Sequence, residues 1–271
     1  MELLSISKGG ITARVNLGSQ QLCSLRCGNR EWMHGASLPK SEQKPEDTLG
    51  WQQSELIMFP VVGPVKDNFL DIDGNEYSMA QHGISRHLPW ELIERNGVMA
   101  RFRQLYLAGT PVANSKIEKG LVWPFSYRME KTYELTGSGL KFTVTVTNES
   151  ETPMRYSTGW HPAFKIHNPY FVAQDSDGDR RISLLEICEA SLKSALVLSR
   201  NELTLVDSGT LTVTTDAPYI MLWSPAGSKM VCIEPTTQHP VWDGIRVPEG
   251  FLLAPKQTKI HQTNIGLNAS S

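Results

Sequence analysis

Cysteine is scarce in this chain, which has 4 among its 271 residues. Cys23 and Cys27 are four positions apart and no second pair matches them, so the spacing lacks the paired pattern of a zinc ribbon. Cys232 lies within an apolar run, which is typical of a small buried side chain. We therefore expect free thiols and a cytoplasmic protein.

Positive charge and long apolar segments are also missing. The formal net charge is -2 at pH 7, so no basic field is available to attract nucleic acid or an anionic membrane. No apolar run reaches the roughly 20 residues that cross a bilayer. The first residues lack the basic start and apolar block of a secretory signal. From these absences we predict that the protein binds neither nucleic acid nor a membrane.

Several motifs of catalysis and metal binding are absent from the sequence. There is no glycine-rich phosphate loop and no G-x-S-x-G elbow. His82 and His87 lack the H-x-H spacing of a cupin-type metal site. A metal ion held by His82, His161 and Glu234 is conceivable, but no tight ligand pair supports it. We therefore predict no metal site.

Short segments with alternating apolar and polar residues recur along the chain, with turn signals between them. In 141–148, for example, Phe142, Val144 and Val146 alternate with threonines, which predicts a half-buried strand. No repeat of 20–50 residues is present. The pattern favours an all-β fold, one large antiparallel β-sandwich over residues 1–271 with few short helices and a frayed tail at 266–271.

Two segments depart from this strand pattern. Residues 184–198 form the best helix candidate, although a pair of strands also fits. Residues 28–51 show no clear period, so we expect a long irregular connection, and connections of this length often border a functional site.

A histidine follows a tryptophan at the end of a predicted strand. Trp160 offers an apolar platform of the kind on which sugars stack, and Pro162 restricts the chain after His161. His161 is then placed to act as a general acid, although a structural histidine near a turn fits the same pattern. His82 and Arg86 lie in a polar loop that suggests ligand contact.

Glu234 emerges directly from a predicted buried strand that Pro235 ends. Partial burial there would raise the pKa of its carboxyl group toward that of a useful general base. A structural ion pair with an arginine is the alternative. Arg86 and Lys66 suit an anionic group such as a sugar phosphate, although exposed cations are often only solvated.

Four sequence blocks, taken in order, resemble the aldose 1-epimerase (galactose mutarotase) family. The histidine-containing blocks and the short length are closest to its hexose-6-phosphate epimerase and uncharacterised bacterial branches. The resemblance covers roughly residues 5–265. The blocks are Phe59-Pro60-Val61-Val62-Gly63, Gln81-His82-Gly83-Ile84-Ser85-Arg86, Gly159-Trp160-His161-Pro162-Ala163-Phe164 and Cys232-Ile233-Glu234-Pro235.

The resemblance implies a β-supersandwich and a cofactor-independent interconversion of the α and β anomers of an aldose or aldose phosphate. Glu234 would take the proton from the anomeric hydroxyl, and His161 would give a proton to the ring oxygen. His82 would hold the sugar and stabilise charge, and Trp160 or Trp223 would stack on the ring. The expected partner is a sugar or sugar phosphate, and the expected state is a monomer or homodimer.

Two departures from the family pattern keep other functions open. Relatives often have arginine where Pro64 stands, and the aspartate that binds a sugar hydroxyl has no clear match. A non-catalytic carbohydrate-binding or sugar-sensing protein of the same fold is therefore the alternative. A metal-dependent, cupin-like isomerase is a third, weaker hypothesis.

Overall fold

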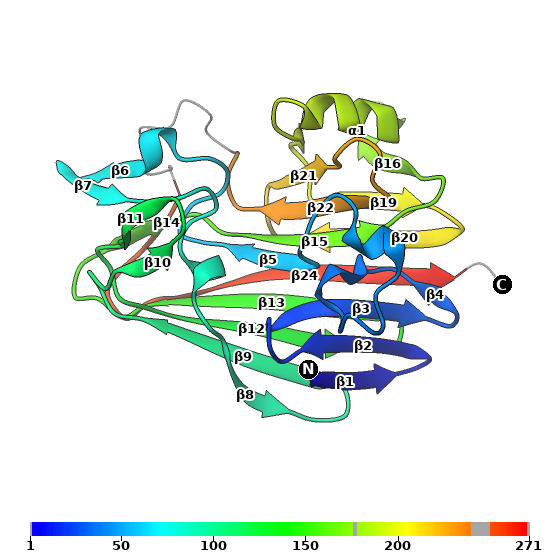
Figure 1. Ribbon diagram of the computed structural model, residues 1–271, viewed down its shortest axis with the longest axis horizontal. Helices are drawn as coiled ribbons and strands as arrows, with labels where there is room; N and C mark the ends of the chain where they lie inside the picture. The colour runs from blue at the N-terminus through cyan, green and yellow to red at the C-terminus, as the bar shows by residue number, and fades with distance from the viewer. Residues whose placement is uncertain (1, 176–177, 240–249, 270–271) are drawn as a thin grey trace.

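The computed structural model describes residues 2–175, 178–239 and 250–269 (Figure 1). Its strands form antiparallel ladders, and the described residues contain one α-helix, which confirms the predicted all-β class. The largest layer is a nine-stranded sheet. In spatial order its strands are β17 (Gly178–Ser183), β16 (Tyr170–Asp175), β19 (Glu202–Val206), β20 (Gly209–Thr215), β24 (Thr258–Ala269), β13 (Gly139–Asn148), β12 (Tyr127–Leu135), β9 (Met99–Tyr106) and β8 (Glu91–Arg95).

A five-stranded sheet forms the second layer and carries residues of the candidate active site. Its strands are β18 (Leu196–Leu198), β21 (Tyr219–Trp223), β22 (Met230–Thr236), β15 (Gly159–Lys165) and β5 (Glu55–Met58). The N-terminal sheet contains β1 (Leu3–Lys8), β2 (Ile11–Asn16), β3 (Gln21–Cys27) and β4 (Arg30–Glu31). A bridge between Met33 and Phe164 connects the chain after β4 to β15, so the N-terminal sheet and the five-stranded sheet are joined there.

Short elements complete the described part of the chain. Three pairs of strands are β6 (Phe69–Ile72) with β7 (Asn75–Ser78), β10 (Val112–Asn114) with β11 (Ile117–Leu121), and β14 (Met154–Tyr156) with β23 (Phe251–Leu253). The helices are α1 (Leu184–Ser191) and four 3-10 turns, η1 (Gly35–Ser37), η2 (Pro45–Thr48), η3 (Lys66–Asn68) and η4 (Ser85–His87).

The helix prediction is confirmed for its first half only. Ser183 caps α1 by accepting a hydrogen bond from the Glu186 amide at 3.2 Å, and 196–198 form strand β18 instead. Residues 28–51 are mainly irregular, as predicted, with the short strand β4 and the turns η1 and η2 inside them. Strand β24 continues to Ala269 and pairs there with Gly209, so residues 266–269, predicted as a frayed tail, belong to the sheet.

The main core lies between the nine-stranded sheet and the second layer. Trp160 of β15 stacks on Phe142 of β13 with ring centroids 4.2 Å apart, and both are buried. Phe59 and Tyr127 make a second aromatic contact between the layers, at 4.6 Å. Side chains alternate between the two faces of a strand. One face of β15 and β22 therefore belongs to this core, and the other face is left for the site described next.

Candidate active site

Two neighbouring strands place His161 and Glu234 side by side. Strands β15 and β22 are antiparallel, and Gly159 pairs with Thr236 as Ala163 pairs with Cys232. In this register His161 lies opposite Glu234, and both side chains point away from the main core. The alternation of β22 explains the direction, because Val231 and Ile233 pack in the core and Glu234 must face the other side.

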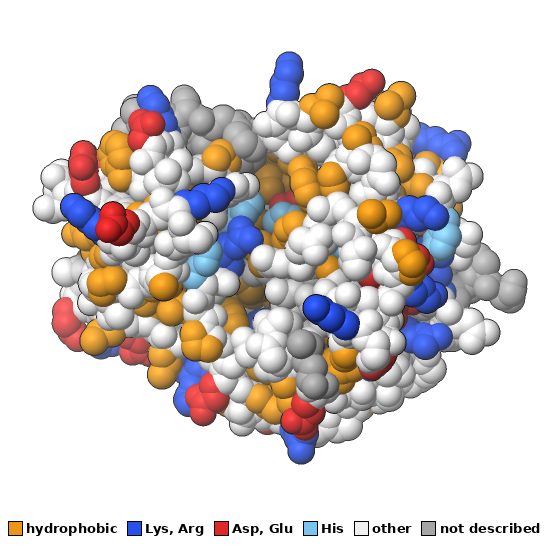
Figure 2. All heavy atoms as spheres, in the orientation of Figure 1, with side chains coloured by type: hydrophobic (Ala, Val, Ile, Leu, Met, Phe, Trp, Pro, Cys, Tyr) orange, Lys and Arg blue, Asp and Glu red, His pale blue; other side chains and the backbone are white. Residues whose placement is uncertain are grey.

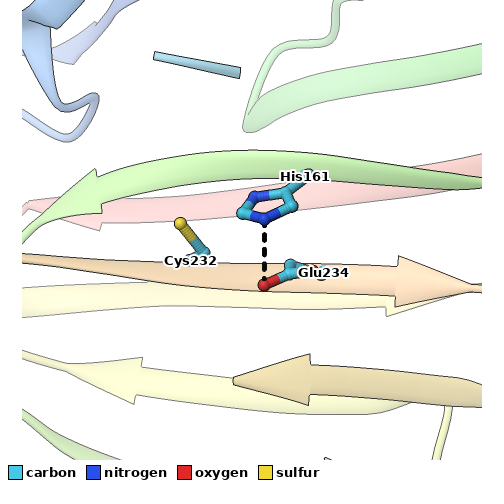
Figure 3. A group of neighbouring side chains, drawn as sticks. All are labelled: His161, Cys232 and Glu234. Atoms are coloured by element: carbon cyan, nitrogen blue, oxygen red, sulfur yellow. Dashed lines mark ion pairs between the residues drawn. The ribbon is translucent and has the colours of Figure 1, made fainter. Parts of the chain in front are cut away.

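The imidazole and the carboxyl group are in contact and almost completely buried. His161 Nε2 lies 3.4 Å from Glu234 Oε1, and the dashed line in Figure 3 marks this contact. Burial raises the pKa of the Glu234 carboxyl well above its ordinary value. Burial also lowers the pKa of the His161 imidazole well below its ordinary value, and electrostatic interactions with His82 and Arg86 add to this effect. Both groups are therefore held toward their uncharged forms.

His82 lies across the site in a tight turn after Gln81. The His82 backbone has φ of 64°, and its amide donates to the Gly63 carbonyl at 2.9 Å. Gly83 follows with φ of 77°, and a Cβ there would lie 2.1 Å from the Phe59 carbonyl oxygen, so this turn requires glycine. The turn directs the His82 ring toward His161, with ring centroids 5.5 Å apart and planes at 88°.

Hydrogen bonding fixes the tautomer of His82. Its Nδ1 accepts from the Gly63 amide at 3.2 Å, so in the neutral ring the proton lies on Nε2. The Gln81 side-chain amide lies 3.1 Å from this Nε2, and its oxygen must face the ring for Nε2 to donate to it. Burial, assisted by the charge of Arg86, lowers the pKa of His82 to about 3. His82 is consequently a neutral hydrogen-bond donor at ordinary pH.

These three side chains line one cavity of about 450 Å³. In Figure 2, which keeps the orientation of Figure 1, the surface of the molecule is hollowed near its centre, and histidine side chains lie at the hollow. A sugar-sized molecule fits such a volume, and the walls combine apolar surface with a few polar groups. The other lining residues are Trp51, Leu56, Gly63, Pro64, Gln81, Ser191, Lys193, Ser194, Ala195, Met221 and Trp223.

The structure brings together some of the predicted binding residues and not others. Trp223 lines the cavity, and its ring lies 6.4 Å from that of His161. Arg86 is half-buried and close enough to lower the pKa of both histidines, but it is not in the cavity lining. Lys66 is exposed on η3 and is also not in the lining.

The predicted sugar platform at Trp160 is wrong. Trp160 precedes His161 on β15, so its side chain leaves the opposite face of the sheet. The ring is buried against Phe142, and Nε1 donates to Glu55 Oε2 at 2.5 Å. Trp160 therefore packs in the main core and does not contact the cavity.

Sequence reasoning missed Trp51 and Lys193. The Trp51 ring stacks on His161, with centroids 4.5 Å apart and planes at 28°. Lys193, just beyond the end of α1, brings a positive charge to the cavity wall. Only Trp51 had a signal in the sequence, since it ends the irregular connection that was expected to border a site.

Cys232 adds a thiol beside the pair. Its side chain is on the same face of β22 as Glu234, and ligand atoms of His161, Cys232 and Glu234 all lie within 4.8 Å of one another (Figure 3). Imidazole, thiol and carboxylate are all ligands that zinc accepts. This set differs from the one considered from the sequence, in which His82 replaced Cys232.

No described helix is long and apolar enough to cross a membrane.

The sequence comparisons gave one family match. Residues 56–189 match the model of the aldose 1-epimerase family, a range that includes His82 and His161. A comparison with curated proteins finds no match.

Similar solved structures share the whole fold at low sequence identity. A galactose mutarotase-like protein from Lactobacillus casei is 20% identical with a TM-score of 0.79, over 98% of this chain and 100% of that one. A galactose mutarotase related enzyme from Lactobacillus acidophilus is 20% identical with a TM-score of 0.78, over 100% and 98%. An aldose epimerase homologue from C. elegans is 16% identical with a TM-score of 0.71, over 99% of each chain.

At these identities the solved structures establish the galactose mutarotase-like fold and nothing more about the site. The family model adds the sequence evidence. The match over residues 56–189, just under half of the chain, is to the aldose 1-epimerase family, and the chain as a whole has the galactose mutarotase-like fold.

Proposed function

We propose that this protein interconverts the α and β anomers of an aldose or aldose phosphate by general acid–base catalysis. The observation that carries the proposal is the His161–Glu234 pair, 3.4 Å apart, in the wall of a sugar-sized cavity that also exposes His82. The match of residues 56–189 to the aldose 1-epimerase family supports a sugar epimerase or mutarotase type of reaction.

The reaction begins with the pair in its ionic form. Glu234 carboxylate takes the proton of the anomeric hydroxyl while His161 imidazolium gives a proton to the ring oxygen. The bond between C1 and the ring oxygen breaks, and an open-chain aldehyde forms. Rotation about C1–C2 presents the other face of the aldehyde, and the reverse proton transfers close the ring as the other anomer.

The remaining cavity residues position the sugar. His82 donates from Nε2 to a sugar oxygen, and because it stays neutral it does not compete with His161 as the acid. Trp223 offers an apolar face for the ring. The stacked ring of Trp51 holds His161 in place and stabilises its imidazolium form. Two further groups, Lys193 in the wall and Arg86 nearby, favour an anionic substituent such as a phosphate.

Polarimetry of freshly dissolved α-aldoses and their 6-phosphates tests the proposal, with protein first treated with a chelator. We expect accelerated mutarotation for at least one sugar. Glu234→Gln and His161→Asn should each lower kcat by about 10² to 10⁴, the usual contribution of a general acid or base. His167→Asn, at an exposed histidine away from the cavity lining, is the matched control and should keep the wild-type rate. Full activity of Glu234→Gln would refute the proposed role of this carboxylate.

Pro64 favours one alternative function. It lines the cavity at the position where relatives often carry arginine, so a sugar contact is lost there. A non-catalytic sugar-binding protein would be stabilised thermally by a sugar without accelerating its mutarotation. Mutarotation at an enzymatic rate excludes this alternative.

A further inference from the structure

We infer that His161, Cys232 and Glu234 form a binding site for a thiophilic divalent metal ion such as Zn²⁺, and that metal binding stops the epimerase reaction. The first half depends only on the geometry of the three side chains. The second half rests on the proposed function, because the same imidazole and carboxylate carry the proton transfers there.

The three side chains converge from two adjacent strands. Cys232 and Glu234 are two positions apart on β22, so they project from the same face, and His161 lies opposite on β15. Their ligand atoms lie within 4.8 Å of one another, and the nitrogen–oxygen distance is 3.4 Å. Ligand atoms around tetrahedral zinc are about 3.3–3.7 Å apart, from bond lengths of about 2.0–2.3 Å. A shift of about 1 Å by the thiol therefore completes a three-ligand site.

Charge balance favours a divalent ion at this buried position. When the ion binds, the Cys232 thiol and the Glu234 carboxyl group each release a proton to solvent, and the resulting thiolate and carboxylate neutralise two positive charges. The neutral imidazole adds a third ligand without charge. The assembled site has no net charge, so the cost of burying the ion is offset by its ligands. Thiolate and imidazole together select zinc or cadmium over magnesium or calcium, which prefer oxygen ligands.

The surroundings also suit a metal ion. His161 Nδ1 is buried and has no hydrogen-bond partner among the described residues, so the ring proton can lie on Nδ1 and leave the Nε2 lone pair free for the ion. His161 and Glu234 line the cavity, which gives an ion a path from solvent and leaves its fourth position open to water. Cys232 lies beneath them, outside the cavity lining.

Metal binding and acid–base catalysis exclude each other here. A coordinated Glu234 carboxylate cannot take the anomeric proton, and a coordinated His161 nitrogen cannot deliver one to the ring oxygen. Zn²⁺ is therefore expected to act as an inhibitor of the metal-free enzyme.

Calorimetric titration of chelator-treated full-length protein with Zn²⁺ tests the binding half. We expect one ion per chain, and Co²⁺ should produce the absorption of a thiolate–cobalt bond. Cys232→Ser should abolish that absorption and weaken Zn²⁺ binding by at least about tenfold, because one of three ligands is lost. Cys27→Ser, which changes a half-buried thiol in the N-terminal sheet, should bind as the wild type does. Cys232→Ala and thermal unfolding of each variant separate loss of a ligand from loss of the fold.

The inhibition half is measured by mutarotation at increasing Zn²⁺ concentrations, each variant against its own metal-free rate. We expect the wild type and Cys27→Ser to lose most of their activity once one ion is bound per chain, and Cys232→Ser to need at least about tenfold more Zn²⁺ for the same loss. Absence of one-to-one binding, or equal affinity in folded Cys232→Ser, overturns the site. Full activity of the Zn²⁺-loaded protein, or activity only after Zn²⁺ is added, overturns the inhibition. If metal-free protein is inactive on every sugar while Zn²⁺ still binds through Cys232, the proposed function fails and the metal site stands.

Discussion

His161 and Glu234 hold a single proton between them in either of two forms. The uncharged pair and the ion pair differ only in whether that proton lies on the carboxyl oxygen or on the imidazole nitrogen, 3.4 Å away. Burial favours the uncharged pair. In the proposed reaction, ring opening turns the ion pair into the uncharged pair, so the environment favours the open-chain stage over the ionic form with which the reaction begins.

The depressed pKa of His82 makes protein stability depend on pH. An unfolded histidine has a pKa of 6.5, whereas folding lowers that of His82 to about 3. Between these values the unfolded chain binds more protons at this position, so stability falls as pH falls. His82→Asn removes the difference and suits a backbone with positive φ. From about pH 6 to pH 4 we expect the wild type to lose about 1.4 kcal/mol more per pH unit than the variant, measured by urea unfolding. Parallel stability curves would contradict the depressed pKa.

Lys193 and Lys66 provide a matched pair of lysines for testing the anionic substituent. Lys193 lines the cavity, whereas Lys66 is exposed and absent from the lining. Lys193→Met should raise KM for an aldose 6-phosphate by about tenfold, and should change KM for the unphosphorylated sugar by less than about twofold. Lys66→Met should leave both values unchanged. Equal effects of Lys193→Met on the two sugars, in steady-state mutarotation kinetics, would show that this charge does not bind phosphate.

The cavity residues that the sequence predicted carry local sequence signals, whereas the cavity residues that it missed do not. His161 and Glu234 are predictable because each lies in a short apolar strand with a proline beside it. Lys193 resembles any solvated lysine after a helix, and only the packing of α1 beside β21 brings it to the cavity. Trp51 likewise reaches His161 through the path of a long irregular segment that carries no periodic pattern.

At the scale of one element, successive residues of β15 face different parts of the molecule, the cavity and the main core. His161 faces the cavity and Trp160 faces the main core, because successive side chains point in opposite directions. Strand alternation was visible in the sequence and predicted the fold correctly. Applying the same alternation to the pair at 160–161 would have excluded Trp160 as a sugar platform.

Substitutions at two tryptophans should separate the effects of the cavity and of the main core. Trp160→Phe removes the hydrogen bond to the buried Glu55 carboxylate and should cost about 1–3 kcal/mol of unfolding free energy, with KM unchanged. Trp223→Leu should raise KM by about tenfold with a smaller loss of stability, because this half-buried ring faces the cavity. Urea unfolding and mutarotation kinetics on both variants measure the two effects. A higher KM in folded Trp160→Phe would contradict the assignment to the core.

At the scale of the whole molecule, one buried carboxylate connects three sheets. Glu55 on β5 accepts hydrogen bonds from Trp160, from the Leu22 amide of β3 at 3.0 Å and from the Tyr133 hydroxyl of β12. Lys131 Nζ, also on β12, lies 3.4 Å from the same carboxylate. These contacts join the five-stranded, N-terminal and nine-stranded sheets, and no periodic pattern in the sequence predicts a charge in this core.

Lys131→Met should leave the Glu55 carboxylate buried without its cation. Breaking a buried ion pair from one side costs about 3–5 kcal/mol, and we expect a loss in this range in urea unfolding. Lys119→Met, at an exposed lysine on β11, should change stability by less than about 0.5 kcal/mol. Equal stabilities of the two variants would show that the pair does not support the contact between the sheets.

Strand β24 lies between β20 and β13 in the nine-stranded sheet, although it comes after every other described strand in the chain. Until it is inserted, the strands on its two sides have unsatisfied edges facing each other across an empty row. During synthesis, a nascent chain that ends before residue 258 therefore lacks the strand that joins the two halves of the nine-stranded sheet. Chaperones that shield such edges would have most to protect in the interval before this last strand leaves the ribosome.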